Sequence, residues 1–258
     1  MISDQILSSI SNGVLTISMN RREKKNALTS FMYETMAELL NSSAENSDVL
    51  CVVIRGQEDL FTSGNDVKDF LNRNSTEIPP AIHFLRAISS YPKPIIAAVG
   101  GQAIGIGTTM LMHCDLVISA TNASFQLPFV NLGLCPEAAS SYLFPKMAGS
   151  KLANQLLLLG ETFNALIAKE AGIVNYITED AMLLDKANEL AQKITSQPPE
   201  AIISTKRLLK CNDQELVRQS MDKEFSEFSR LLNTKACKEI FTAFLEKRPV
   251  NKSLVFGK

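Results

Sequence analysis

The segment from Pro94 to Pro145 limits the fold more than any other, because only two of its 52 residues, Asp115 and Glu137, carry a charge. So few charges predict that most of the segment is buried. Its first part, residues 94–114, is nearly long enough to cross a bilayer, but a proline and four glycines interrupt it. The segment therefore predicts a buried strand, a glycine loop and a buried helix rather than a membrane span.

Hydrophobic periodicity extends this pattern over the rest of the chain. Strands are expected at residues 13–19, 49–55, 94–99, 116–120 and 174–177. Helices are expected from Thr29, from Asp66, and at residues 106–114, 151–159, 164–171 and 181–194. From Pro198 onward the pattern predicts only helices. We therefore expect an α/β core over residues 1–197, followed by a C-terminal helical region over residues 198–258.

Composition excludes several classes of partner. The chain has 258 residues, of which 45% are hydrophobic, so it can bury a sizeable core as one large domain or two small ones. Its 26 basic and 27 acidic residues leave a net charge of −1, which does not support nucleic acid or an acidic membrane surface as a partner. Five cysteines without a Cys-x-x-Cys spacing argue against a metal site or a disulfide framework, and indicate free thiols in a reducing compartment.

Neither end of the sequence carries a recognisable targeting signal. Residues 1–20 include Asp4 and lack the basic start and long apolar core of a secretory signal. The last three residues, 256–258, do not match the Ser-Lys-Leu address of peroxisomal proteins. We therefore expect a cytoplasmic protein that does not insert into a membrane.

Glu137 is the most informative single residue, because no other charge lies between residues 116 and 145. A carboxylate in apolar surroundings loses hydration, so its pKa rises and it becomes a better proton acceptor near neutral pH. This is the profile of a general base. The alternative is a solvated turn after Pro136, where an acidic residue favours the start of a helix.

Two glycine loops are candidates for binding a negative oxygen. Gly64 stands in Ser-Gly-Asn-Asp, and Gly105 and Gly107 stand in Ala-Ile-Gly-Ile-Gly, each where a strand is expected to lead into a helix. Glycine allows close approach of the backbone, and free N–H groups at a helix start attract an anion. Together the loops suit an oxyanion hole. Each loop alone also fits an ordinary tight turn, and Gly-x-Gly without a third glycine is a poor dinucleotide motif.

Four ordered motifs resemble the crotonase, or enoyl-CoA hydratase and isomerase, superfamily across nearly the whole chain. Residues 20–28 resemble the first CoA-binding loop, and residues 61–66 the first oxyanion segment. Residues 91–95 and 101–107 resemble the strand and the second oxyanion loop. Residues 125–136, with Phe144-Pro145, resemble the region that faces the acyl group. The resemblance implies a spiral of ββα repeats, with a C-terminal helical region that covers the active site and forms a trimer or a dimer of trimers.

The resemblance also assigns residues to the site. The backbone N–H groups of Asn65 and Ile106 would hold the thioester oxygen of an acyl-CoA substrate, and no separate cofactor or metal is implied. Lys24 and Lys25 are candidates for contacting the CoA phosphates, and the alternative is that they are solvated charges in a turn. The resemblance suggests that Lys247 and Arg248 contact the phosphates across a subunit boundary. The residues expected to bind the substrate or its CoA are Lys25, Ala27, Thr62, Ser63, Gly64, Asp66, Gly105, Phe129 and Leu134.

Two departures from the hydratase pattern favour an isomerase. Hydratases of this family carry two glutamates, and the matching positions here are Thr109 and Phe129, neither of which can act as a carboxylate base. Glu137 stands where hydratases commonly have glycine. Its sequence Cys-Pro-Glu-Ala-Ala-Ser-Ser-Tyr resembles the Δ3,Δ2-enoyl-CoA isomerase branch, in which this acid is the single base. We therefore expect Glu137 to move one proton while the two amides stabilise a dienolate.

Other functions remain open from the sequence alone. Isomerases of an epoxide or oxepin thioester in aromatic degradation keep an acid after the same proline, although they tend to use aspartate. Enoyl-CoA hydration and a non-catalytic CoA-binding scaffold are further alternatives. His83 and His113 are interpreted as core or surface histidines rather than catalysts, and no Ser-His-Asp constellation is expected.

Overall fold

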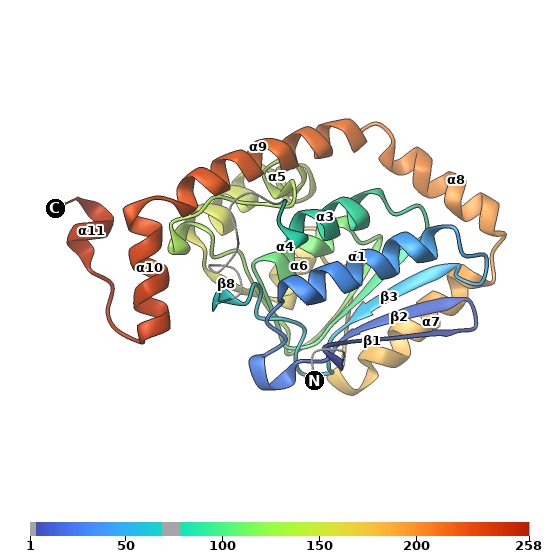
Figure 1. The fold of residues 1–258 in the computed structure, drawn as a ribbon. Helices are drawn as coiled ribbons and strands as arrows, with labels where there is room; N and C mark the ends of the chain where they lie inside the picture. Colours follow the sequence, from blue (N-terminus) through green and yellow to red (C-terminus); the bar gives the residue numbers. More distant parts are fainter. Residues whose placement is uncertain (1–3, 69–77, 258) are drawn as a thin grey trace.

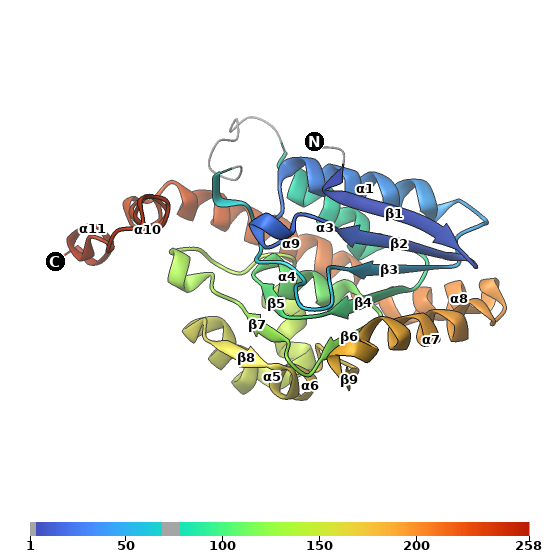
Figure 2. The same cartoon turned by 90° about the horizontal axis from the view of Figure 1, so that it is seen from below.

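A six-stranded sheet forms the centre of the molecule in the computed structural model, which describes residues 4–68 and 78–257. The strand order is β1-β2-β3-β4-β6-β9. Strand β1 is antiparallel to β2, and the remaining neighbours are parallel (Figure 2). The strands are β1 (Ile6–Ser11), β2 (Val14–Met19), β3 (Cys51–Arg55), β4 (Ile95–Val99), β6 (Leu116–Ala120) and β9 (Tyr176–Thr178).

Helices cover both faces of this sheet, so its central strands are buried on both sides. Helices α1 (Ser30–Ala44) and α3 (Pro80–Ser90) pack together over one face, and α7 (Leu183–Thr195) contacts β3, β4 and β6 on the other (Figure 1). Successive residues of β3 alternate between the two apolar cores: Val52 and Ile54 belong to one, Cys51 and Val53 to the other. This explains why residues 49–55 form a continuous apolar run.

A second, three-stranded sheet lies beside the first. It contains β5 (Gln102–Ile104), β7 (Ser124–Gln126) and β8 (Thr162–Asn164), with β5 parallel to β7 and β7 antiparallel to β8. Several short helical elements follow strands: η2 (Arg22–Lys24), α4 (Ile106–Thr109), η4 (Val130–Leu132), α6 (Ala165–Glu170) and η5 (Asp180–Met182). A further one, η3 (Met110–His113), directly follows α4. The second glycine loop connects β5 to α4 through Gly105.

The chain after residue 198 is helical, as predicted. Helices α8 (Pro199–Lys210) and α9 (Gln214–Leu232) run back over the molecule, and α9 packs on α3 and on α5 (Ser140–Leu159). Helices α10 (Lys235–Glu246) and α11 (Lys252–Phe256) extend away from the core (Figure 1). Trimer formation by this region, and the division at residue 197, stay predictions.

Several predicted elements differ in extent from the observed ones. Helix α5 begins at Ser140 rather than at 151, because Pro145 and a non-helical Gly149 conceal a kinked helix. The helix expected at 106–114 is split into α4 and η3. The helix expected from Asp66 lies largely outside the described residues. Within the part of the chain that is described, no helix has the length and apolarity needed to cross a membrane.

Candidate active site

The two glycine loops lie against each other and are joined by backbone hydrogen bonds. The N–H of Thr62 donates to Gln102 O (2.8 Å), and the N–H of Ile104 donates to Thr62 O (3.1 Å). Gly64 has φ +89°, and a Cβ there would come within 2.8 Å of Ile104 O. Only glycine therefore allows this approach. The two glycine loops singled out in the sequence therefore lie side by side, and their role as an oxyanion hole stays a prediction.

Each loop presents a backbone N–H with no acceptor among the described residues. Ile106 is the first residue of α4, where intrahelical acceptors are lacking. Beside Asn65, Leu28 N–H donates to Gly64 O (2.8 Å) and Asp66 N–H donates to Leu28 O (2.9 Å), so the bridge to Leu28 leaves the Asn65 N–H unused. A Cβ added to Gly105 would meet nothing within 4 Å, so open space adjoins the Ile106 amide.

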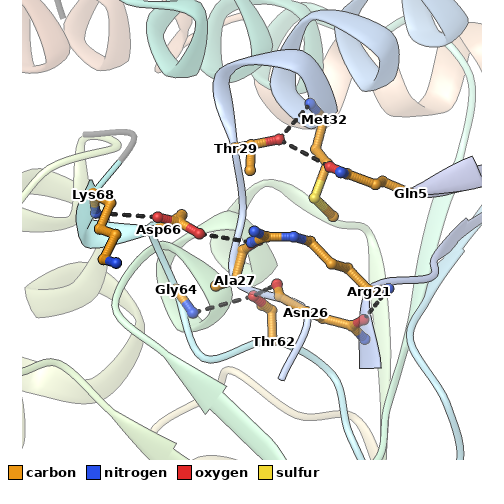
Figure 3. A network of polar contacts seen from close by, with 10 residues as sticks. All are labelled: Gln5, Arg21, Asn26, Ala27, Thr29, Met32, Thr62, Gly64, Asp66 and Lys68. Carbon is orange, nitrogen blue, oxygen red and sulfur yellow. Dashed lines mark hydrogen bonds and ion pairs between the residues drawn. The ribbon is translucent and has the colours of Figure 1, made fainter. Parts of the chain in front are cut away.

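A polar network fixes the first loop (Figure 3). Arg21 pairs with Asp66 (2.7 Å) and donates to Ala27 O (2.9 Å). Thr62 Oγ1 donates to Asn26 O (2.6 Å) and accepts from Gly64 N–H (3.1 Å). The side chains of Thr62 and Asp66, which were predicted to bind substrate, are thus engaged with the protein itself.

Further supports of this loop were missed by sequence reasoning. The buried Tyr33 donates from its hydroxyl to Asn65 Oδ1 (2.7 Å). The side chain of the fully buried Asn26 accepts from Arg21 N–H and donates to Gln57 Oε1 and Phe61 O. The Tyr33–Asn65 contact and the contacts of Asn26 with Gln57 and Phe61 each join residues 31 to 35 positions apart, so no local sequence motif indicates them.

Glu137 lies half-buried in the loop before α5, and its carboxylate meets α4. Thr109 Oγ1 donates to Glu137 Oε1 at 2.5 Å. Burial raises the pKa of Glu137 to about 8; the Thr109 hydrogen bond lowers it, and the charge of Glu224 raises it further. A solvated turn would not raise the pKa in this way, so the structure favours the buried-acid interpretation.

Helix α4 links the acid to the second glycine loop. Thr109, which holds Glu137, and Ile106, which carries the free N–H, are three residues apart on this helix. Residues at this spacing share a helix face, with Cβ atoms roughly 5–6 Å apart. Phe129 and Leu134, which were predicted to bind the substrate, are buried in the same apolar core as Ile106. A carboxyl group near free backbone N–H groups suits the removal of a proton beside a carbonyl whose oxygen accepts from those N–H groups.

The remaining predicted residues are placed as follows. Lys24 and Lys25 are exposed, and the Lys25 carbonyl accepts from Ser63 N–H (3.0 Å), which brings this turn beside the first loop. Arg248 is paired with Glu239 and Glu246 at the end of α10. CoA binding by these cations stays a prediction.

His113 is a core residue, which is one of the two alternatives, core or surface, that the sequence left open. It is 3% exposed, and its ring bonds to Ala138 O (2.8 Å). Burial lowers the pKa of His113 to about 4, so the ring is neutral near pH 7. Among the described residues, no cluster of three or more His, Cys, Asp or Glu side chains is arranged to hold a metal ion.

Comparison with known proteins agrees with the fold and the motifs. The family model described as Enoyl-CoA hydratase/isomerase matches residues 9–252. The chain is 31% identical to 1,2-epoxyphenylacetyl-CoA isomerase of Escherichia coli (strain K12), over 94% of this chain and 96% of that protein. It is 30% identical to Enoyl-CoA delta isomerase 2 of Rattus norvegicus, over 96% of this chain and 65% of that protein.

A solved structure gives the same result. The crystal structure of an enoyl-CoA hydratase/isomerase from Pseudoalteromonas atlantica T6c is 38% identical, with a TM-score of 0.91, and the match covers 96% of this chain and 99% of that one. Other relatives of similar identity are named as hydratases, so the comparisons do not separate isomerase from hydratase. The chain belongs to the enoyl-CoA hydratase/isomerase family and has the crotonase fold.

Proposed function

We propose that this enzyme is a Δ3,Δ2-enoyl-CoA isomerase of fatty-acid β-oxidation, which converts a 3-enoyl-CoA into the trans-2-enoyl-CoA. One observation carries the proposal: Glu137 is a half-buried carboxyl with a pKa of about 8, and it accepts a hydrogen bond from Thr109. Thr109 itself stands where hydratases have a glutamate. One acid is then available instead of the two that hydration uses. A single proton shuttle needs no second acid.

The proposed reaction moves one proton. Glu137 takes a proton from the α carbon, and the electrons form a dienolate whose oxygen accepts from the Asn65 and Ile106 amides. The protonated Glu137 then returns a proton to the γ carbon, which re-forms the thioester carbonyl with the double bond at the 2,3 position. A carboxyl whose pKa lies near the working pH is well matched to this exchange. Each oxyanion donor is worth roughly 3 kcal/mol in the transition state.

The test is to supply purified protein with 3-hexenoyl-CoA and to follow the conjugated enoyl thioester by absorbance. A parallel assay with crotonyl-CoA measures water addition. We expect rapid isomerisation and slow hydration, because neither Thr109 nor Phe129 can activate water. Rapid hydration without isomerisation would refute the proposal.

A second candidate is isomerisation of an epoxide thioester, which the 31% identity to 1,2-epoxyphenylacetyl-CoA isomerase favours. The same oxyanion site and single carboxyl would serve an acyl group with a strained ring. Assaying 1,2-epoxyphenylacetyl-CoA beside 3-hexenoyl-CoA, and comparing kcat/KM, decides between them. A higher value for the epoxide would make it the preferred substrate.

We also propose that the chain forms a trimer, or a dimer of trimers, through its C-terminal helices. Phe244 on α10 and Phe256 on α11 are 65% and 68% exposed, and a second copy would cover such side chains. Light scattering coupled to size exclusion measures the mass directly. A monomer at micromolar concentration would contradict this proposal.

A further inference from the structure

The turn that follows Glu137 has a backbone conformation that needs external support. Ala138 has φ +61° and Ala139 has φ +56°, so two consecutive residues with side chains adopt the left-handed conformation. Single non-glycine residues adopt it only rarely, and such conformations persist when the surroundings impose them. Because the turn immediately follows Glu137, whatever imposes it also sets the direction of the Glu137 side chain.

The support comes from Glu224, in the middle of α9. Its carboxylate accepts from Ala139 N–H (2.6 Å), from Ser141 N–H (2.9 Å) and from Ser141 Oγ (2.5 Å). Glu224 is only 7% exposed, although most acidic residues of α9 face the solvent. It lies 85 residues from Ala139 in the sequence, so the contact is purely tertiary.

The opposite side of the turn is held by neutral groups. The His113 ring bonds to Ala138 O (2.8 Å), and Ser140 Oγ donates to Glu137 O (2.6 Å). Glu224 therefore supplies the only carboxylate that the described residues place against this turn. Its removal would leave the buried Ala139 N–H and the partly buried Ser141 N–H without this acceptor, which disfavours the observed turn.

The charge of Glu224 is also felt at Glu137. Burial is the largest effect and raises the pKa of Glu224 above its ordinary value, and the three hydrogen bonds partly offset this rise because they favour the ionised form. The like charge of Glu224 in turn raises the pKa of Glu137. The other titratable and charged groups that act on this turn or on its neighbours are His113, Cys135, Lys206, Lys210, Glu227 and Arg230.

These neighbours do not reproduce the effect of Glu224. His113 has a pKa of about 4 and Cys135 a pKa of about 11, so both are neutral between pH 6 and 9. Glu227 is exposed and paired with Arg230 at the surface. Among the described residues, no cation forms an ion pair with Glu224. Its charge therefore remains available to act on Glu137.

We propose that Glu224 is a positioning residue: through Ala139 and Ser141 it fixes the turn that aims the Glu137 carboxylate at the substrate. The C-terminal helix α9 is then part of the active-site architecture rather than only a cover or an assembly element. This inference rests on the proposed role of Glu137 as the base. It does not depend on which thioester the enzyme isomerises.

Three substitutions separate geometry from charge. Glu224→Ala removes both the hydrogen bonds to the turn and the negative charge. We expect kcat to fall about 10- to 100-fold, because a misplaced catalytic group costs about this much, and KM to stay within about threefold. Glu224→Gln keeps the size and removes the charge, so the pH limb of kcat that reports Glu137 moves to lower pH. Glu224→Asp keeps the charge but shortens the reach, so that limb stays in place while kcat falls. Glu227→Gln, one turn further along α9, is the matched control and changes neither.

A readout without substrate keeps this inference separate from the proposed function. The carboxyl of Glu137 is titrated by infrared difference spectroscopy, with its band assigned by its loss in Glu137→Gln. We expect the Glu137 titration to move to lower pH in Glu224→Gln and to stay unchanged in Glu227→Gln. If the titration moves but the wild type isomerises no enoyl-CoA, the proposed function fails, whereas the coupling of Glu224 to Glu137 stands. An unchanged titration in Glu224→Gln together with wild-type kcat in folded Glu224→Ala would overturn the inference.

Discussion

The stability of the protein should depend on pH through Glu137, and Glu137→Gln should remove that dependence. The folded-state pKa of Glu137 is about 8, against an ordinary value of 4.5. Between these values the folded chain binds more protons than the unfolded chain, so the free energy of unfolding falls as pH rises. The contribution is complete below pH 4.5 and is lost as the pH rises through 8.

The size of this effect follows from the pKa gap. At about 1.36 kcal/mol per pH unit, a rise from 4.5 to about 8 sets an upper limit of about 5 kcal/mol. Glu137 is partly exposed, and solvent lowers the cost of its charge, so we expect about 2–4 kcal/mol in practice. The free energy of unfolding of Glu137→Gln, measured relative to that of the wild type, should therefore be higher above pH 8 than at pH 5.

Urea unfolding at pH 5, 7 and 9, at one fixed protein concentration, measures the difference between the two proteins. Fixed concentration matters because oligomer formation would also change the apparent stability. Glu227→Gln is the control, since Glu227 is exposed and its pKa is lowered by Arg230. If wild type and Glu137→Gln lose stability in parallel from pH 5 to pH 9, Glu137 does not carry a raised pKa.

Three further substitutions test other parts of the site. Thr109→Val removes a hydrogen bond to a charged acceptor, which is worth about 1.5–3 kcal/mol. The rising limb of kcat/KM against pH, expected near 8 in the wild type, should therefore move to higher pH. Thr109→Ser keeps the hydroxyl and should leave this limb in place. Gly105→Ala adds about 1–3 kcal/mol of backbone strain and puts a methyl group beside the Ile106 amide, so kcat/KM should fall at least about tenfold. Gly149→Ala is the control: Gly149 has φ +73°, and a Cβ there would also meet nothing within 4 Å. It carries similar strain away from the site and should not lower kcat/KM. Asn26→Ala breaks three hydrogen bonds of a fully buried side chain and should lower the free energy of unfolding by about 2–4 kcal/mol in urea; a loss below about 0.5 kcal/mol would show that this network does not hold the first loop.

The sequence predicted elements well where burial leaves a continuous pattern. Strands β3, β4 and β6 are buried along nearly their whole length, so each appears as an apolar run. Strand β1 is exposed at five of its six positions, so it gives no such signal. Strands β5, β7 and β8 have three residues each, too few to show a period.

The candidate site was predictable in part, for the same physical reason. Glu137 could be located because its charge is isolated in an apolar segment, and the glycine loops because positive φ and close approach require glycine. Glu224 gave no signal, because it lies among the many charges of α9, and only the tertiary fold brings it to Ala139. Tyr33 and Asn26 support the first loop through contacts that are likewise remote in sequence.

The most direct measurement is the rate of 3-hexenoyl-CoA isomerisation by wild type and by Glu137→Gln, with Glu227→Gln as a control for the substitution itself. Removing a general base typically costs about 10²- to 10⁴-fold. We predict that Glu137→Gln loses at least this much in kcat while binding the thioester with similar affinity, and that Glu227→Gln matches the wild type. A folded Glu137→Gln that isomerises the substrate at the wild-type rate would contradict the single-carboxylate mechanism.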